Sequence, residues 1–465
     1  MKILLIDPHI EISNHFQNNQ NVHIFRTNEL VLDFKNSPDF EQVYNLKESE
    51  LQLTILKLRK LGPLWVRWTD QHFEMEMILR ESLQFYLYLK SYLKNLNVKY
   101  AIFHTSICHH LYDNIVQMVL EDLKIPQIFL YGIQVCNRLL PLIQSSTISD
   151  RKSLDLKVNS YNGKQDIALF ESNLKQAKPP ALNVTHSHNN KSIFFALFFW
   201  LQFFLKLKIK GIKSNSEIPY VSKLASRTFF NGIQLLLSQR EAIKFYQEKM
   251  DPFIEDEILS KPEISLLIAA HYQPEATTFP EGGEWNNYLD QILLIRSHGY
   301  QGTIYFKEHP ASFSYYDHIV GLTKVGCFRS VDFYQSLLKL GCKFVPPTVS
   351  LKEDSRIFPK ILPITMTGSI AIERSLLGYP TIVTGFPWYT GMPGCYSLKD
   401  IKKALRIGFK EKLILETKKF LIHKISNHTL VNAVGIATGL PTSNPNVFSD
   451  FLSDYEQLIN TLRKK

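Results

Sequence analysis

The chain has 465 residues, enough for two or three domains of ordinary size, each with a core of its own. Hydrophobic residues make up 45% and charged residues 21% of the sequence, a globular composition that excludes disordered and collagen-like chains. The formal net charge of +10 favours phosphate-bearing ligands or an anionic membrane surface, and it does not choose between them.

The first half of the chain alternates between strand-like and helical patterns. We expect strands at 3–6, 22–26, 100–104 and 127–131, and helices at 77–96 and 111–123. Strand–helix–strand units of this length predict a parallel sheet covered by helices.

The ends and cysteines of the chain indicate its compartment. The N-terminal sequence MKILLIDPHI has no long apolar region or cleavage site of a signal peptide. The five cysteines are scattered and form no CxxC pair, which is typical of a reducing compartment. We therefore expect a cytoplasmic protein.

A segment rich in phenylalanine follows a polar stretch near the middle of the chain. Residues 193–205 are apolar except for Gln202, but crossing a bilayer takes about 20 residues. Lysines follow at positions 206, 208, 210 and 213, so 193–213 could lie as a helix on the inner face of a membrane. A core or lid helix with a basic end is the alternative.

The second half repeats the α/β alternation. We expect strands at 264–270, 303–306, 343–345, 362–365 and 381–384, and helices at 228–250, 288–297, 331–340, 370–377 and 447–462. The simplest architecture that explains both halves is α/β, with two doubly wound, Rossmann-like domains that face a cleft. The last helix could pack back across the domain junction.

Three polar clusters adjoin strands of the second domain, and ligands of doubly wound sheets bind at the carboxyl ends of strands. In the first cluster, HYQPE (271–275), Gln273 and Glu275 could hydrogen-bond a polar ligand, or the loop could satisfy its own backbone. The second is KEHP (307–310). There Lys307 adds positive charge and Pro310 holds His309 extended, so that the imidazole could give a proton to a leaving phosphate.

The third cluster is TGS (367–369), between a predicted strand and a predicted helix. Ser369 suits a helix N-cap, and Gly368 lets a ligand approach the backbone. Together with Thr367 they would present the first N–H groups of the helix to a phosphate. Glu373, four residues after Ser369, could accept hydrogen bonds from ribose hydroxyls. An ordinary capped helix is the alternative.

The order HYQPEATTFPEGG, YFKEHP and TGSIAIERSLLGYPTIVTG resembles the capsule polysaccharide biosynthesis proteins, over about residues 240–390. These proteins are related to bacterial Kdo transferases and to sialyltransferases with an HP motif. The resemblance implies a GT-B glycosyltransferase that uses a nucleotide-activated sugar, often a CMP-linked acidic one, without a cofactor or a catalytic metal.

The resemblance also implies roles for the cluster residues. His309 and Pro310 would contact the donor phosphate, with His309 assisting departure of the nucleotide. Thr367, Gly368 and Ser369 would lie at the phosphate, and Gln273 and Glu275 would line the donor side. We therefore expect His309 and Glu275 as the catalytic residues, and we add Lys307, for its charge, and Glu373, for its spacing from Ser369, to the donor-binding residues. The sialyltransferases commonly carry two hydroxyl residues where this chain has Gly368-Ser369, which leaves the donor open.

The domain boundaries follow from this interpretation. We expect an acceptor-side domain at 1–185, a connector at 186–250, a nucleotide-sugar domain at 251–440 and a C-terminal helix at 441–465. The catalytic base would come from the N-terminal domain, where Asp7, His9 and His104 stand at predicted strand ends without a clear order among them.

The expected partners are a nucleotide-sugar donor, a saccharide or lipid-linked acceptor and an anionic membrane surface, and no motif indicates nucleic acid. Three other functions stay open: a UDP-sugar 2-epimerase-like enzyme, a polyol-phosphate transferase, and a non-catalytic component of polysaccharide assembly.

Overall fold

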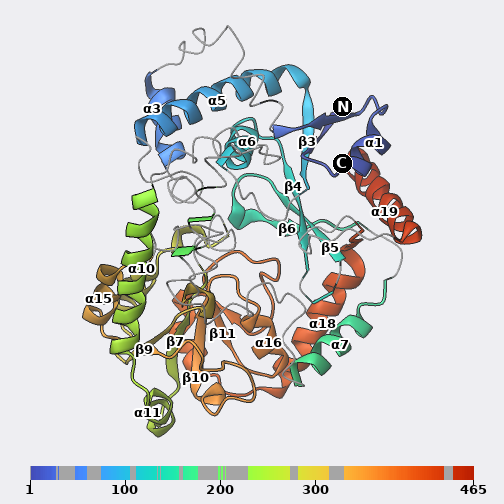
Figure 1. The fold of residues 1–465 in the computed structure, drawn as a ribbon. Helices are drawn as coiled ribbons and strands as arrows, with labels where there is room; N and C mark the ends of the chain where they lie inside the picture. Colours follow the sequence, from blue (N-terminus) through green and yellow to red (C-terminus); the bar gives the residue numbers. More distant parts are fainter. Residues whose placement is uncertain are drawn as a thin grey trace. The chain divides into compact units, whose positions relative to one another are not determined.

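The computed structural model describes residues 2–27, 30, 48–59, 75–104, 111–133, 135–136, 138–156, 161–175, 197–198, 201–202, 205, 229–272, 281–313, 329–433 and 444–464 (Figure 1). They form two compact units. The first comprises Met1–Gly163, Ile212–Ala225 and His423–Lys465, and the second comprises Lys164–Gly211 and Ser226–Ile422.

The first unit is built on one mixed sheet. Its elements are β1 (Lys2–Ile6), α1 (Ile10–Phe16), β2 (Val22–Phe25), α3 (Glu48–Arg59), α5 (Met75–Leu96), β3 (Val98–Phe103), α6 (Leu111–Asp122), β4 (Gln127–Gly132), β5 (Arg138–Gln144), β6 (Lys152–Ser153), β13 (Leu430–Val431) and α19 (Pro445–Lys464). The strand order is β13-β5-β4-β3-β1-β2, with β6 beside β5. The four strands from β4 to β2 are parallel, and β5 is antiparallel to its neighbours.

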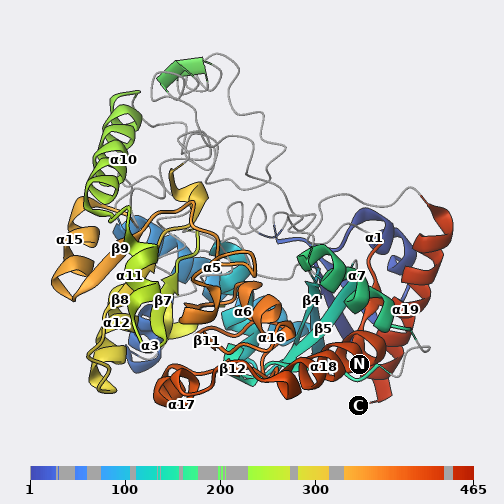
Figure 2. The ribbon, with the colours of Figure 1, turned by 90° about the horizontal axis from the view of Figure 1, so that it is seen from below.

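The C-terminal helix belongs to the first unit. Phe451, Tyr455 and Leu458 of α19 are fully buried against the apolar residues of β1 and β3. Arg463 of the same helix donates to Asn19 Oδ1 at 3.2 Å, so the two ends of the chain lie side by side (Figures 1 and 2). The expected return of the last helix to the N-terminal domain is confirmed.

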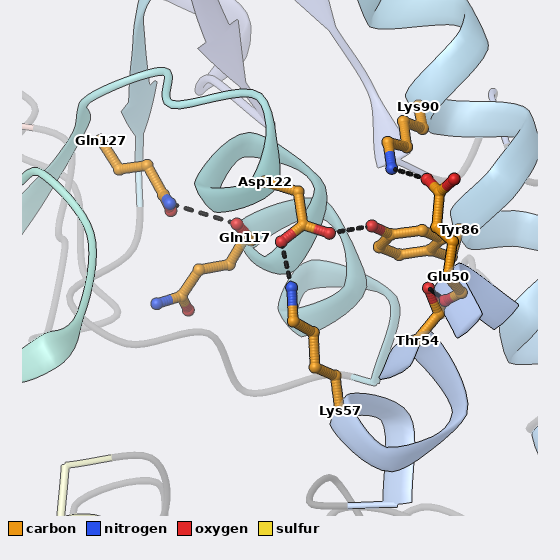
Figure 3. A network of polar contacts seen from close by, with 8 residues as sticks. All are labelled: Glu50, Thr54, Lys57, Tyr86, Lys90, Gln117, Asp122 and Gln127. Carbon is orange, nitrogen blue, oxygen red and sulfur yellow. Dashed lines mark hydrogen bonds and ion pairs between the residues drawn. The ribbon is translucent and has the colours of Figure 1, made fainter. Parts of the chain in front are cut away.

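A polar network ties three helices of the first unit together (Figure 3). Asp122 at the end of α6 accepts hydrogen bonds from Lys57 of α3 and Tyr86 of α5. Lys90 of α5 bonds to Glu50 Oε1 of α3 at 2.8 Å. Because α6 ends here and β4 then begins, Asp122 marks the amino edge of β4, away from the strand ends at which such sheets bind ligands.

The second unit has a purely parallel sheet. Its elements are α7 (Lys164–Lys175), α10 (Phe229–Lys249), α11 (Ile254–Ser260), β7 (Ser265–Ala269), α12 (Tyr288–Ser297), β8 (Ile304–Lys307), α15 (Val331–Lys339), β9 (Cys342–Val345), β10 (Ile361–Thr365), α16 (Ile370–Leu376), β11 (Thr381–Val383), β12 (Cys395–Tyr396), α17 (Ile401–Leu405) and α18 (Glu411–His428). Along β9-β8-β7-β10-β11-β12 the strands follow the sequence order 3-2-1-4-5-6 of a Rossmann fold.

Each face of this sheet has its own core, since successive side chains of a strand point to opposite faces. Ile304 and Phe306 of β8 pack with residues of α10, α12, α15 and α17. Tyr305 of β8 instead packs with Ile254 and Ile258 of α11 on the second face. Figure 2 shows α10 beside α15. Burial on both faces explains the nearly continuous apolar runs that predicted these strands.

The α/β class with two Rossmann-like units is confirmed. Within α18 the chain passes from the second unit back to the first. The predicted boundaries at 185 and 440 fall outside the described residues, and the connector stays a prediction.

Candidate ligand site at the switch point of the second sheet

The strand order of the second sheet reverses between β7 and β10. β7 lies between β8 and β10. On the β8 side the sheet continues to β9, and on the β10 side it continues to β11 and β12. Open α/β sheets bind ligands in the crevice that this reversal leaves at the carboxyl ends of the strands. All three predicted clusters follow β7, β8 or β10, so the structure brings their described residues to this edge.

A row of residues crosses the sheet just below this edge. Lys307 of β8 is paired in register with Ala269 of β7 and with Val345 of β9. One step beyond the Ile364–Ile268 pair, Thr365 of β10 lies beside Ala269. Alternation from Tyr305 and Ile361 places these side chains on the second face. Lys307 and Thr365 therefore lie on either side of Ala269 on the same face of the sheet. Their strands are about 10 Å apart, which is two strand spacings.

Lys307 is the unusual member of the row. Its side chain is only 8% exposed, and it forms no hydrogen bond or ion pair with any described residue. Burial lowers the pKa of Lys307 to about 8. An unpaired cation held this way costs stability unless a ligand anion offsets it.

His271 follows β7 and reaches across to β10. Its Nε2 lies 2.8 Å from Thr365 Oγ1 and 3.4 Å from the backbone nitrogen of Thr367. Its own backbone N–H donates to the hydroxyl of Tyr288 at 2.6 Å. Burial, together with the charges of His309 and Arg329, lowers the pKa of His271 to about 3. The ring is therefore neutral and fixed at the switch point.

Gly368 lies against the same hydroxyl. Its N–H donates to Thr365 Oγ1 at 3.2 Å, and a Cβ added to Gly368 would stand 2.6 Å from that oxygen. Glycine is needed here because the hydroxyl of Thr365 fills the space of a side chain. Tyr389 donates its hydroxyl proton to the Gly368 carbonyl at 2.7 Å, which fixes the other side of the peptide.

Ser369 takes the N-cap position of α16, but not in the predicted way. Its hydroxyl donates to Glu373 Oε1 at 2.9 Å and makes no capping bond to the helix backbone. Burial raises the pKa of Glu373, and the hydrogen bond from Ser369 opposes that rise. The Thr367 and Gly368 N–H groups, predicted to bind phosphate, already have internal acceptors.

Within KEHP, Glu308 forms a buried ion pair that no motif of the sequence predicts. Arg329 Nε donates to Glu308 Oε1 at 2.7 Å, and the two side chains are 3% and 0% exposed. Burial opposes the charge of Arg329, yet the Glu308 carboxylate raises the pKa of Arg329 above its usual value. The pair fixes the backbone next to His309.

Arg329 also connects the first two clusters. Its Nη2 donates to the His271 carbonyl at 3.2 Å, and its guanidinium stacks on Tyr288, whose hydroxyl holds the His271 N–H. His309 lies near enough to His271 for its charge to act on that ring, and 6.2 Å from Tyr272 between ring centroids. Arg329 stands in no motif of polar residues, so only its place in the fold reveals it.

Loops after β7 and β11 pack on the TGS loop. Phe386 N donates to the Glu281 carbonyl at 2.8 Å, and Gly385 N donates to the Met366 carbonyl at 3.0 Å. A Cβ on Gly385 would lie 2.5 Å from the Glu281 carbonyl oxygen and 2.9 Å from Thr367. The edge is thus closed on the β11 side by tightly packed backbone.

Two predicted site residues, Gln273 and Glu275, lie outside the described residues. Pro310 begins a short 3-10 helix after His309, and the His309 carbonyl accepts from Ser312 N at 2.9 Å.

The base candidates of the first unit have internal partners. Asp7 accepts from the N–H and hydroxyl of Thr27 at 2.8 and 2.5 Å, and His9 pairs with Glu11. His104 donates from Nδ1 to the Ile6 carbonyl and accepts from Tyr455 at Nε2, so neither of its ring nitrogens is available as a base.

Among the described residues, no cluster of three or more His, Cys, Asp or Glu side chains could hold a metal ion. In the same part of the chain, no helix has the length and apolar character needed to cross a bilayer.

Comparison with known proteins finds resemblance only among solved structures. No protein-family model and no curated sequence matches the chain. The β-Kdo 2,7 transferase KpsC of Thermosulfurimonas dismutans is 10% identical, covers 97% of this chain and 99% of its own, and gives a TM-score of 0.32. UDP-GlcNAc 2-epimerase of Methanocaldococcus jannaschii is 12% identical, with coverages of 91% and 99% and a TM-score of 0.24. The enzyme from Neisseria meningitidis is 13% identical over the full length of both chains, with a TM-score of 0.19.

Proposed function

We propose that the protein is a GT-B glycosyltransferase, which moves a sugar from a nucleotide-activated donor to a saccharide or lipid-linked acceptor of a cell-surface polysaccharide. The donor would bind at the carboxyl edge of the second sheet. The observation that carries the proposal is Lys307, a nearly buried ammonium that has no partner among the described residues and lies in one row with Thr365, beside the switch point. Such a cation calls for an anionic ligand, and a nucleotide phosphate supplies one.

The expected chemistry follows from charge. Glycosyl transfer leaves negative charge on the departing phosphate while the sugar becomes cationic. Lys307 would stabilise that negative charge, and His309 would donate a proton or hydrogen bond to the leaving oxygen. The CMP-linked acidic donor, the absence of a catalytic metal and the roles of Gln273, Glu275, Pro310, Ser369 and Glu373 are parts of this proposal.

A nucleotide screen tests the proposal directly. The melting temperature of the wild-type protein is measured with CMP, UDP, GDP and CDP, since a ligand of the folded state raises it. We expect one of the four to stabilise the wild type and the Lys339→Met control, whose lysine is exposed on α15, but not Lys307→Met. Equal stabilisation of both variants, or of neither variant nor the wild type, contradicts the proposal.

Product analysis separates the remaining activities. An enzyme that epimerises free UDP-sugar would act without acceptor, and a polyol-phosphate transferase would leave phosphate in its product. Sugar transfer requires acceptor and leaves a phosphate-free linkage.

Contact with a membrane is the second part of the proposal. Phe198, Leu201 and Leu205 are helical and 40% to 54% exposed. The lysines at 206, 208, 210 and 213 follow in the sequence and suit anionic lipid. Replacing the three apolar residues by Glu should abolish sedimentation with anionic vesicles. Unchanged sedimentation would rule out this contact.

A further inference from the structure

The hydrogen bonds of His271 determine which ring nitrogen carries the proton. Its Nε2 lies within hydrogen-bond distance of the Thr367 backbone nitrogen, at 3.4 Å, and of Thr365 Oγ1, at 2.8 Å. A peptide N–H can only donate, so Nε2 must be the acceptor. A neutral imidazole with a bare Nε2 carries its proton on Nδ1.

Thr365 determines which way the hydrogen bonds around His271 run. Gly368 N donates to Thr365 Oγ1 at 3.2 Å, so the hydroxyl directs its own proton toward His271 Nε2. Protonating Nε2 would leave the Thr367 N–H without an acceptor and would turn the Thr365 hydroxyl around. The backbone of the TGS loop thus selects the Nδ1–H form of His271.

The other ring nitrogen has no protein partner in the described part of the chain. His271 Nδ1 forms no hydrogen bond with any described residue. The side chain is partly exposed, and it lies above Ala269 on the face that carries Lys307. A polar N–H is therefore presented beside the ammonium.

The surrounding groups keep the ring neutral. Arg329 bonds to the His271 carbonyl, His309 acts on the ring through its charge, and the Tyr288 hydroxyl accepts the backbone N–H. The Glu308 carboxylate is paired with Arg329, 2.7 Å from its Nε. With burial, these charges lower the pKa of His271 to about 3.

We propose that His271 binds the donor as a hydrogen-bond donor, giving its Nδ1–H to a phosphate oxygen, while proton transfer is left to His309. This assignment rests on the proposed function and adds to it a specific role for His271. Lys307 would then neutralise the phosphate, and His271 would orient it without adding a charge.

Two matched variants separate ligand binding from structural support. A glutamine side chain can place its amide near the Nε2 position and keep the bond to Thr365, whereas asparagine places its amide near Nδ1. We expect His271→Gln to weaken binding of the stabilising nucleotide roughly tenfold or more, with a small change in melting temperature. His271→Asn should weaken binding less. Glutamine binding as tightly as wild type overturns the proposal.

A spectroscopic measurement separates this proposal from the proposed function. Protein labelled with ¹⁵N-histidine, with His271 assigned by the asparagine variant, is titrated with inorganic phosphate and with each of the four nucleotides. We expect an Nδ1–H tautomer from pH 5.5 to 8 whose Nδ1 signal moves on binding. If phosphate moves it but no nucleotide does, the nucleotide donor fails and the role of His271 stands. A ring protonated on Nε2, or unmoved by every probe, overturns the role itself.

Discussion

Each sheet of the protein has a histidine where its strand order reverses, and the two histidines are held in different ways. His104 follows β3 in the first sheet, with one ring nitrogen on the Ile6 carbonyl and the other on Tyr455. His271 follows β7 in the second sheet, and within the described ranges only its Nε2 has partners. Burial lowers the pKa of both, to about 4 and about 3.

This difference distinguishes a histidine that supports the fold from one that can bind a ligand. A ring with both nitrogens engaged by its own fold contributes to packing, and here it joins α19 to the sheet. A ring with one open nitrogen, beside an unpaired Lys307, can take a ligand. Both histidines occupy the same position in their sheets. They differ in whether the second ring nitrogen has a partner in the fold.

The largest expected effect is on transfer itself. His309→Ala should lower the rate of donor consumption roughly 100-fold, because it removes a proton donor from the leaving phosphate. The rate is measured by nucleotide release with saturating donor. His15→Ala, an exposed histidine of the first unit, serves as the control and should keep full activity. Full activity of His309→Ala would point to a non-catalytic role.

Lys307→Met should weaken nucleotide binding ten- to hundredfold while it stabilises the unliganded protein. The lysine has a lower pKa in the fold than in the unfolded chain, about 8 against 10.5, so its burial opposes folding by about 3 kcal/mol at pH 7.

Calorimetric titration and urea unfolding measure the two effects. The unfolded chain binds more protons than the fold between pH 8 and 10.5, so the stability gain of Lys307→Met should shrink over that range. A less stable Lys307→Met protein at pH 7 would mean that the ammonium has a structural partner.

The two histidines predict a shared sensitivity to acid. Their folded pKa values lie below the unfolded value of 6.5, so the unfolded chain takes up more protons and stability falls as the pH drops below 6.5. Each should cost about 2 kcal/mol between pH 6.5 and 5. His271→Gln should remove about half of that loss in urea unfolding. A full loss in the variant would show that His271 is protonated in the folded protein.

The smallest effect should come from a change next to His104, whose two ring nitrogens both have partners. Tyr455→Phe leaves the buried Nε2 of His104 without a donor and should destabilise the protein by about 1–2 kcal/mol. Its nucleotide affinity should match that of the wild type, which titration would check. Loss of affinity would contradict the separation between the two histidines.

Much of the fold was predictable because periodicity is strong where burial is complete. The helix Tyr288–Ser297 was predicted to the residue, and β7, β8, β10 and β11 to within one residue at each end. β5 was not predicted: its sequence RLLPLIQ contains a proline, and the strand pairs antiparallel with a segment that is far off in the sequence.

The location of the site residues could be predicted from the sequence, but their hydrogen-bond partners could not. A polar run after a strand locates His271 and Lys307, but which nitrogen or cation lacks a partner depends on neighbouring strands. Arg329 and Thr365 illustrate this, since each acquires its role from residues more than 20 positions away. The capping role expected for Ser369 is wrong because its backbone is already helical, with φ −58° and ψ −20°, and its hydroxyl accepts no backbone N–H; it donates to Glu373 instead.

A crystal structure with the nucleotide that stabilises the protein would show whether Lys307 and His271 bind the same phosphate. We expect a phosphate oxygen within about 3 Å of both Lys307 Nζ and His271 Nδ1, at the carboxyl ends of β7 and β8. A nucleotide bound elsewhere, with Lys307 still unpaired, would contradict it.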